Sequence, residues 1–328
     1  MQNVFKRLQK YAELSRILRF VLCFAILSVA TASPAQESTR SSKKVVTADA
    51  GQRSRAELDQ LAREAADVRG DTYVSLVPDL QSVFQGREPS SLKELKALED
   101  QQSRVAEAIE SVTVNVQQGA AQGSGVIITP DGYVFTAAHV AGGADREAWL
   151  MFSDGTRVKA RTLGMNRNKD AGLLKIIDKR PGDQPWPYAT LGRSRYLRSG
   201  QWVVAAGHPG GWKNGRGTVI RVGRLLKIEG AHTLFTDCAL IGGDSGGPLF
   251  TLEGKLVGIH SRIGTDVDQN MHVPIDVFEE GWDRMVQKEV WGVLPGFRPI
   301  IGVVATRGDD RPLLGEVVRG GPAHKAGL

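Results

Sequence analysis

The sequence predicts an all-β protein, and three observations support that fold class. Glycine accounts for 38 of the 328 residues, well above its usual share of about 7%. Short β-rich runs follow one another from Val112 to about residue 280, separated by Gly, Asp, Asn and Pro. No long helical pattern alternates with them, which argues against a parallel α/β sheet. We therefore expect residues 112–280 to form an antiparallel domain large enough for two small barrels.

The first 35 residues have the pattern of an export signal. Thirteen uncharged residues at 20–32 follow a basic start, and Pro34 and Glu37 end the apolar run. This order of basic, apolar and small residues predicts a secretory signal peptide at 1–35. A retained transmembrane anchor is the alternative, although a membrane span needs about 20 apolar residues.

The basic charge of the chain belongs mostly to this signal. The whole sequence has 42 Lys+Arg and 36 Asp+Glu, a formal charge of +6. Residues 1–35 hold five of the basic and one of the acidic residues, which leaves 37 and 35, or +2. We therefore expect no nucleic-acid partner, and a membrane contact only if the signal is not cleaved.

Residues 36–107 are predicted to be a linker followed by a helical region. The polar stretch 36–53 has no sustained period and is typical of a flexible linker. Capping boxes at Ser54–Glu57 and Ser91–Glu94 predict helices over 55–69 and 92–110. The apolar face of the second helix holds Leu92, Leu95, Leu98, Val105 and Ile109. These helices could pack on the β domain, pack on a neighbouring subunit or act as a spacer. A further helical pattern near 276–289 closes the β domain.

Three strings carry the candidate chemistry: TAAHV around His139, NKDAGLLK around Asp170, and GGDSGGPLF around Ser245. A serine hydroxyl is a weak nucleophile that needs an imidazole as general base, and the imidazole needs a carboxylate to fix its tautomer. Glycines beside the serine allow the N–H groups of Gly243 and Ser245 to form an oxyanion hole. Asp244 lies between them and is counted with the oxyanion-hole residues.

An α/β-hydrolase is the rival interpretation, because GDSGG also fits the nucleophile elbow G-x-S-x-G. That fold requires a helix after the serine and a catalytic His downstream of it. Here a strand-like run, PLFTLEGKLVGI, follows Ser245, and His139 lies upstream. We therefore reject the elbow.

The strings GSGVIITPDGYVFTAAHV, NRNKDAGLLKI, AAGHPGG and FTDCALIGGDSGGPLF resemble the HtrA (DegP-like) family of serine proteases. Secreted digestive proteases have a disulfide cysteine after the catalytic His, where this chain has Val140. The resemblance implies a trypsin-like protease domain at 108–290, made of two six-stranded antiparallel β-barrels. His139, Asp170 and Ser245 would act as base, orienter and nucleophile.

The resemblance also implies a function and a setting. The expected protein is an exported ATP-independent serine endopeptidase that cleaves unfolded or misfolded proteins in the periplasm or cell envelope. It would be a homo-oligomer, a trimer or a larger assembly, and would need no cofactor or metal. Two alternatives stay open: a chaperone or scaffold that binds unfolded chains, and a membrane-anchored regulatory protease with a narrow substrate.

Asp244 departs from the family pattern, which has Asn before the nucleophile. In digestive proteases an Asp at this position pairs with a new N-terminus, and no such terminus is evident here. A buried, unpaired carboxylate is costly. Our hypothesis is that Asp244 needs another cation or hydrogen-bond donors, and that the order of the Ser245 loop depends on that partner.

The substrate pocket is expected to be apolar. Cleavage after Lys or Arg needs an acid six residues before the serine, where this chain has Ala239. We place Ala239, Leu240 and Ser261 in the pocket and expect Val, Ala, Leu or Ile at P1. Cys238, the one thiol left after export, is interpreted as a small packing residue.

Residues 298–328 resemble the first third of a PDZ domain. Residues 300–302 would begin the strand that receives a peptide, and GGPAHKAGL would begin the first helix. A peptide groove needs both its strand and its facing helix, and the second is missing. We expect either that the sequence is a piece of a longer protein or that the PDZ-like segment is degenerate.

Overall fold

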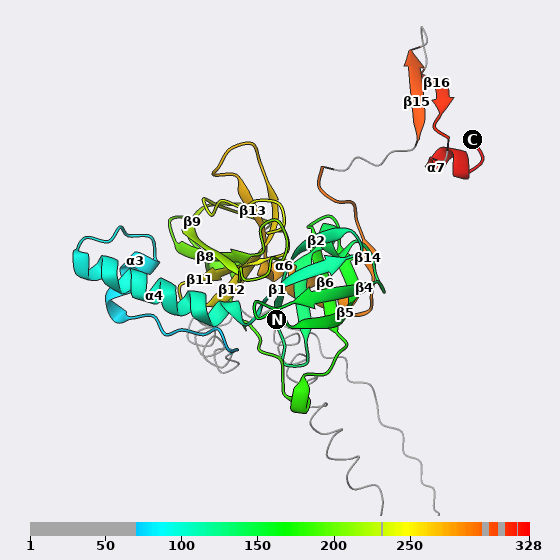
Figure 1. The fold of residues 1–328 in the computed structure, drawn as a ribbon. Coiled ribbons are helices and arrows are strands. Elements are labelled where there is room, and N and C mark those ends of the chain that lie inside the picture. The colour runs from blue at the N-terminus through cyan, green and yellow to red at the C-terminus, as the bar shows by residue number, and fades with distance from the viewer. Residues whose placement is uncertain (1–69, 231, 297–301, 308–311, 320) are drawn as a thin grey trace, which may run out of the picture.

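The computed structural model describes residues 70–230, 232–296, 302–307, 312–319 and 321–328 (Figure 1). The expected signal peptide, linker and first helix fall at 1–69, outside the described residues. Within the described ranges, no helix has the length and apolar character needed to cross a membrane.

The first barrel closes as six antiparallel strands in the order β5-β4-β1-β2-β3-β6, because β5 also pairs with β6. Its strands are β1 (Thr113–Gln118), β2 (Ala121–Ile127), β3 (Tyr133–Ala137), β4 (Glu147–Met151), β5 (Arg157–Asn166) and β6 (Ala171–Ile176). The short strand β14 (Val290–Trp291) adds to β5 in parallel. The turn residues predicted from the sequence, such as Pro130 to Gly132, therefore connect strands that are adjacent in one closed sheet.

The second barrel repeats this plan, in the order β11-β8-β9-β10-β13-β12, and β11 pairs with β12 to close it. Its strands are β8 (Trp202–Gly207), β9 (Val219–Glu229), β10 (Thr233–Thr236), β11 (Pro248–Thr251), β12 (Lys255–Ile263) and β13 (Asn270–Pro274). Strand β7 (Thr190–Leu191) adds to β12 in parallel. The predicted fold of two six-stranded antiparallel barrels is confirmed (Figure 1).

Helix α6 (Ile275–Val286) covers the first barrel after the chain leaves the second. Its Phe278 is fully buried against Phe135, with ring centroids 4.3 Å apart, and Trp282 packs edge-on against Tyr133 at 5.1 Å. The helical pattern expected near 276–289 is therefore present, and its aromatic face joins the cores of the two barrels.

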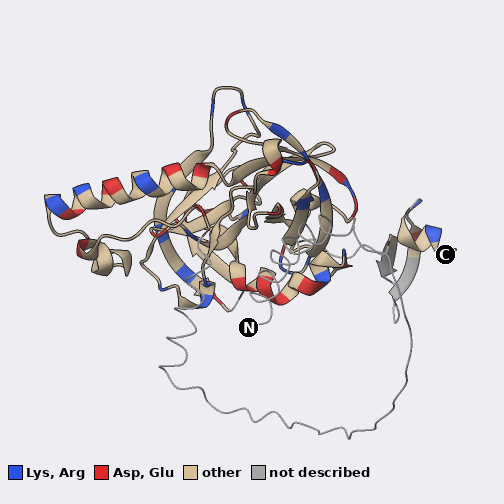
Figure 2. Ribbon diagram, turned by 90° about the horizontal axis from the view of Figure 1, so that it is seen from below, with Lys and Arg blue, Asp and Glu red and all other residues tan. Residues whose placement is uncertain are grey.

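Helix α4 (Leu92–Glu110) begins as the capping box predicts, since the hydroxyl of Ser91 accepts the N–H of Glu94. Leu98, Val105 and Ile109 are buried, but Leu92 and Leu95 are 67% and 51% exposed. The later part of this apolar face therefore packs on the described protein, whereas its first turn is exposed. Charged side chains of both signs are spread along this helix (Figure 2).

Short elements complete the described chain, and the sequence patterns did not predict most of them. The helical turns are η1 (Pro78–Leu80), α3 (Gln81–Phe84), α5 (Ala138–Ala141), η2 (Pro181–Asp183) and η3 (Ser194–Tyr196). Near the C-terminus, β15 (Val303–Arg307) and β16 (Pro312–Val317) form an antiparallel hairpin, followed by α7 (Pro322–Lys325). This hairpin and turn do not identify a PDZ domain, so that resemblance stays a prediction.

Replacing Phe278 tests how far α6 supports the barrels. We expect Phe278→Ala to lower the free energy of unfolding by about 3–5 kcal/mol, because a fully buried aromatic side chain leaves a cavity. Phe278→Leu, which keeps most of the volume, should cost clearly less. Chemical denaturation of the two variants measures the difference. Equal losses would show that the ring does not pack as described.

Candidate active site

His139 lies on the single helical turn α5, directly after strand β3 of the first barrel. Its side chain is 38% exposed, and Nδ1 lies 2.9 and 3.0 Å from the two carboxylate oxygens of Asp170. An ionised Asp170 places the proton on Nδ1, which leaves the lone pair of Nε2 available toward the solvent side. The imidazole is thus held in the tautomer that a general base requires.

Asp170 ends the turn between β5 and β6 and is only 3% exposed. Its φ of 59° is in the left-handed region, which Asp adopts more readily than most residues. Besides the ring of His139, its carboxylate accepts the backbone N–H of His139 at 3.0 Å and the hydroxyl of Ser261 at 2.6 Å. Three donors therefore hold this buried carboxylate in one orientation.

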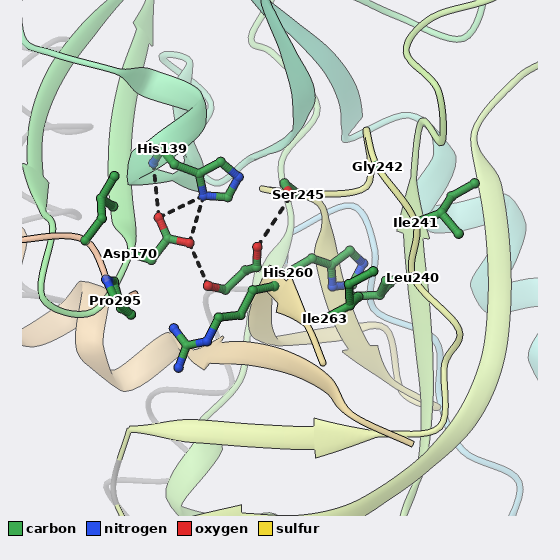
Figure 3. Close-up of a pocket in the computed structure, with 12 residues that line it drawn as sticks. His139, Asp170, Leu240, Ile241, Gly242, Ser245, His260, Ile263 and Pro295 are labelled. Atoms are coloured by element: carbon green, nitrogen blue, oxygen red, sulfur yellow. Dashed lines mark hydrogen bonds and ion pairs between the residues drawn. The ribbon is translucent and has the colours of Figure 1, made fainter. Parts of the chain in front are cut away.

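Ser245 comes from the second barrel, in the loop between β10 and β11. It lines the same cleft as His139 and Asp170 (Figure 3). This cleft has a volume of about 350 Å³. Its hydroxyl donates to the carbonyl of Ser261 at 3.4 Å, a long contact, and not to His139. The structure brings the three predicted residues together, with the serine hydroxyl turned away from the imidazole.

The backbone before Ser245 leaves two N–H groups without acceptors. Among the described residues, the N–H groups of Gly243 and Ser245 donate to no backbone or side-chain oxygen, whereas that of Asp244 donates to the carbonyl of Ile241 at 3.1 Å. Gly243 has φ +100°, and a Cβ there would lie 2.6 Å from Gly210 N. The amides of Gly243 and Ser245 are therefore available to an oxyanion, and the predicted third member, Asp244, has its amide already used.

Ser124 joins the two barrels at this loop. Its N–H donates to the carbonyl of Ser245 at 2.7 Å, and its hydroxyl donates to the carbonyl of Gly243 at 2.8 Å. The same hydroxyl accepts the N–H of His208 at 2.9 Å. Sequence reasoning missed this residue, and the signal for it was a serine between two glycines in the GSGV run.

The substrate pocket differs in part from the predicted set. Leu240 and Ser261 line the cleft, but Ala239 is exposed and is not among the residues that form it. The hydroxyl of Ser261 is bound to Asp170, so this residue supports the carboxylate as well as lining the pocket. The side chains that sequence reasoning missed are mostly apolar and come from three segments: Ile241, His260, Arg262, Ile263, Leu294 and Pro295.

Two buried histidines contact each other at the cleft, and His260 is one of its lining residues. Nδ1 of His260 is 2.9 Å from Nδ1 of His272, and Nε2 of His272 is 2.7 Å from the hydroxyl of Thr236. Burial lowers the pKa of His272 to about 3, and burial followed by the neighbouring His272 and Arg221 lowers the pKa of His260 well below its usual value. Both rings are therefore neutral at ordinary pH.

Cys238 is 1% exposed, and burial raises the pKa of its thiol to about 12. A thiol in this state is unreactive, which agrees with a packing role. Within the described ranges, no group of three or more His, Cys, Asp or Glu side chains is arranged to hold a metal ion.

Comparison with known proteins identifies the domain. A family model described as a trypsin-like peptidase domain matches residues 123–259. The chain is 37% identical, over 226 residues, to a probable periplasmic serine endoprotease DegP-like of Pseudomonas savastanoi pv. phaseolicola, with 63% of this chain and 45% of the relative aligned. A protein of the same name from Hahella chejuensis is 33% identical over 65% of this chain and 47% of its own length.

Over the aligned residues, the chain is similar to DegP-like serine endoproteases. It spans about half the length of the curated relatives it matches. The crystal structure of Deg5 aligns with a TM-score of 0.50 and 20% identity, over 62% of this chain and all of Deg5, which supports the fold. Residues 123–259 therefore belong to a trypsin-like peptidase domain. The names of its relatives also support the exported, periplasmic localisation that the sequence predicts.

Removing the hydroxyl of Ser124 tests the contact between the two barrels. Ser124→Ala leaves the carbonyl of Gly243 and the N–H of His208 without their partner, which should cost about 1–3 kcal/mol of stability. We expect kcat to fall by about tenfold or more, because the amides of the oxyanion hole are then less firmly held. Peptide hydrolysis and thermal unfolding measure the two effects. An unchanged kcat would mean that the backbone bond to Ser245 is sufficient.

The buried histidine pair predicts how stability depends on pH. Unfolded histidines take up protons near pH 6.5, but these two do not while folded, so the unfolded state binds more protons below that pH. The free energy of unfolding should be highest above pH 6.5. It should decrease as the pH falls from 6.5 toward 4, by up to about 1.4 kcal/mol per pH unit for each histidine. Denaturation curves at several pH values should show a shallower fall in His272→Gln. The exposed His232→Gln should leave the slope unchanged, and an equal slope in all three proteins would contradict the assignment.

Proposed function

We propose that this chain is an exported ATP-independent serine endopeptidase that cleaves unfolded or misfolded proteins. The observation that carries the proposal is the contact of both carboxylate oxygens of Asp170 with Nδ1 of His139, across one cleft from Ser245. Each residue alone has a structural explanation. A buried carboxylate fixing an exposed imidazole, opposite a serine flanked by free amides, has its most direct explanation in acyl transfer.

In this proposal Ser245 Oγ attacks the scissile carbonyl while Nε2 of His139 takes its proton. The hydroxyl first turns from the carbonyl of Ser261 toward the imidazole, since the two are not bonded at rest. Asp170 stabilises the imidazolium, and the amides of Gly243 and Ser245 stabilise the negative oxygen. The imidazolium then protonates the leaving amine, and a water molecule activated by the same imidazole releases the acyl group.

The proposed specificity is for small or medium aliphatic residues at P1. Leu240, Ile241 and Ile263 give the cleft apolar walls. The position that would hold an acid in a trypsin-like pocket is Ala239, and its side chain lies outside the cleft. Burial of an aliphatic side chain against these walls is favourable. Asp170, the carboxylate among the residues that line the cleft, is already bound by His139 and Ser261, so it is not available to a Lys or Arg.

The organisation of the chain is part of the same proposal. Residues 1–35 would direct export, 36–107 would form a linker and helical region, 108–290 would be the protease domain, and 298–328 would be a PDZ-like segment. Leu92 and Leu95, exposed on α4, are apolar surface that assembly of a homo-oligomer would cover.

The decisive test is cleavage of unfolded casein by the purified protein and by Ser245→Ala. We expect the variant to lose essentially all turnover, because removal of the nucleophile costs many orders of magnitude in rate. Ser199→Ala, on an exposed turn outside the cleft, should retain full activity. A fluorophosphonate should label the wild-type protein at Ser245, as identified by mass spectrometry. A wild-type protein that suppresses aggregation but neither cleaves nor labels would instead be a chaperone.

A further inference from the structure

Asp244 makes hydrogen bonds within the loop that carries Ser245. It is fully buried, its N–H donates to the carbonyl of Ile241, and its carbonyl accepts the N–H of Gly247 at 2.8 Å. One carboxylate oxygen, Oδ2, accepts the N–H of Ile241 at 2.9 Å. Backbone and side chain of Asp244 thus tie together both ends of the segment that holds Gly243 and Ser245.

The charge of this carboxylate is met by Arg221. Nη1 of Arg221, on strand β9, lies 3.2 Å from Oδ2 of Asp244, and the two side chains are 20% and 1% exposed. Burial raises the pKa of Asp244, while the N–H of Ile241 and then the charge of Arg221 act against that rise. Arg216 adds a weaker positive influence, and its own guanidinium binds the carbonyls of Pro209 and Gly211 at 2.6 Å.

The end of strand β8 packs directly against the carboxylate of Asp244. A Cβ on Gly207, the last residue of β8, would lie 2.6 Å from Oδ1 of Asp244. Among the described residues, Oδ1 accepts no hydrogen bond. Without its counter-ion, Asp244 would be a buried charge against strand β8, and the favourable response is for the loop to shift toward water.

Arg221 itself is held by the barrel. It lies opposite Ala205 in the antiparallel ladder of β8 and β9, so its position is set when the second barrel closes. The cation that orders the loop is thus a strand residue that is present from the time of folding. No new chain end is needed to supply it.

We propose that Arg221 is a positioning residue for the reaction: its guanidinium neutralises Asp244 and so holds the amides of Gly243 and Ser245 in place. This inference rests on the proposed peptidase function and adds to it a partner for the Asp that replaces Asn in the family pattern. Arg221 touches no reacting atom. It acts through the carboxylate that precedes the nucleophile.

The test compares Arg221→Met with Arg224→Met. Arg224 is three residues along the same strand, with an 18% exposed side chain that pairs at 2.7 Å with the exposed Glu88, so it is a matched control. We expect Arg221→Met to lower kcat and the rate of fluorophosphonate labelling by about tenfold or more, with KM little changed, because the oxyanion amides lose their alignment. Arg224→Met should match the wild type, and Arg221→Lys should recover part of the loss.

The double variant Asp244→Asn with Arg221→Met shows whether the effect of Arg221→Met comes from the unpaired charge of Asp244 or from the loss of the arginine side chain itself. Asp244→Asn removes the buried charge, so Arg221→Met should do little further harm in that background. The double variant should then be more active than Arg221→Met alone. Equal activity of Arg221→Met and Arg224→Met would overturn the proposal, as would a double variant no better than Arg221→Met.

Hydrogen exchange gives a measure that does not need activity. In the Ser245→Ala background, Arg221→Met should speed exchange in the peptide that covers residues 240–248, and Arg224→Met should not. Faster exchange with a wild-type protein that does not cleave would reject the proposed function and keep the positioning role. Unchanged exchange would overturn the positioning role, whatever the activity.

Discussion

The site depends on the contact that fixes one barrel against the other. His139 and Asp170 belong to the first barrel and Ser245 to the second, so their geometry is only as firm as the interface between them. Ser124, in the first barrel, contributes to this interface with two short hydrogen bonds to the second barrel. One goes to the carbonyl of Ser245 and the other to that of Gly243. A misplacement of about 1 Å can cost a hundredfold in rate, so a single serine at this seam has a large effect.

Two buried carboxylates flank this seam, and the chain stabilises them in different ways. Asp170 accepts hydrogen bonds from His139 and Ser261, and in the proposed mechanism its charge stabilises the imidazolium. Asp244 has one backbone donor and the guanidinium of Arg221. In the proposed function the charge of Asp170 takes part in the reaction, whereas the charge of Asp244 is neutralised by Arg221 and serves to hold the loop. The difference follows from what each carboxylate faces, an exposed imidazole or the end of strand β8.

The local strings predicted the residues whose roles depend on near neighbours in sequence. His139, Asp170 and Ser245 each have a diagnostic context, and the glycine-rich turns predicted two antiparallel barrels. Ser124 and Arg221 act across 121 and 23 residues of chain, from Ser124 to Ser245 and from Arg221 to Asp244, and no local pattern reports such pairings. Ala239 was misplaced because counting back from the serine fixes distance along the chain but not the direction of a side chain. The exposure of Leu92 and Leu95 could not be predicted, because helical periodicity does not say where the surface that a helix covers ends.

The ion pair also explains how the chain accommodates an Asp directly before Ser245. An Asp without a counter-ion would oppose burial of the loop, whereas an Arg without the Asp would be a partly exposed strand residue like Arg224. Arg221 lies opposite Ala205 on β8, and the end of β8 packs against the carboxylate of Asp244. The strand pairing that closes the barrel therefore also sets the position of the cation that faces Asp244. In this proposal the amides of Gly243 and Ser245 are as stably placed as strands β8 and β9, because Arg221, whose charge holds their loop, is part of that strand pair.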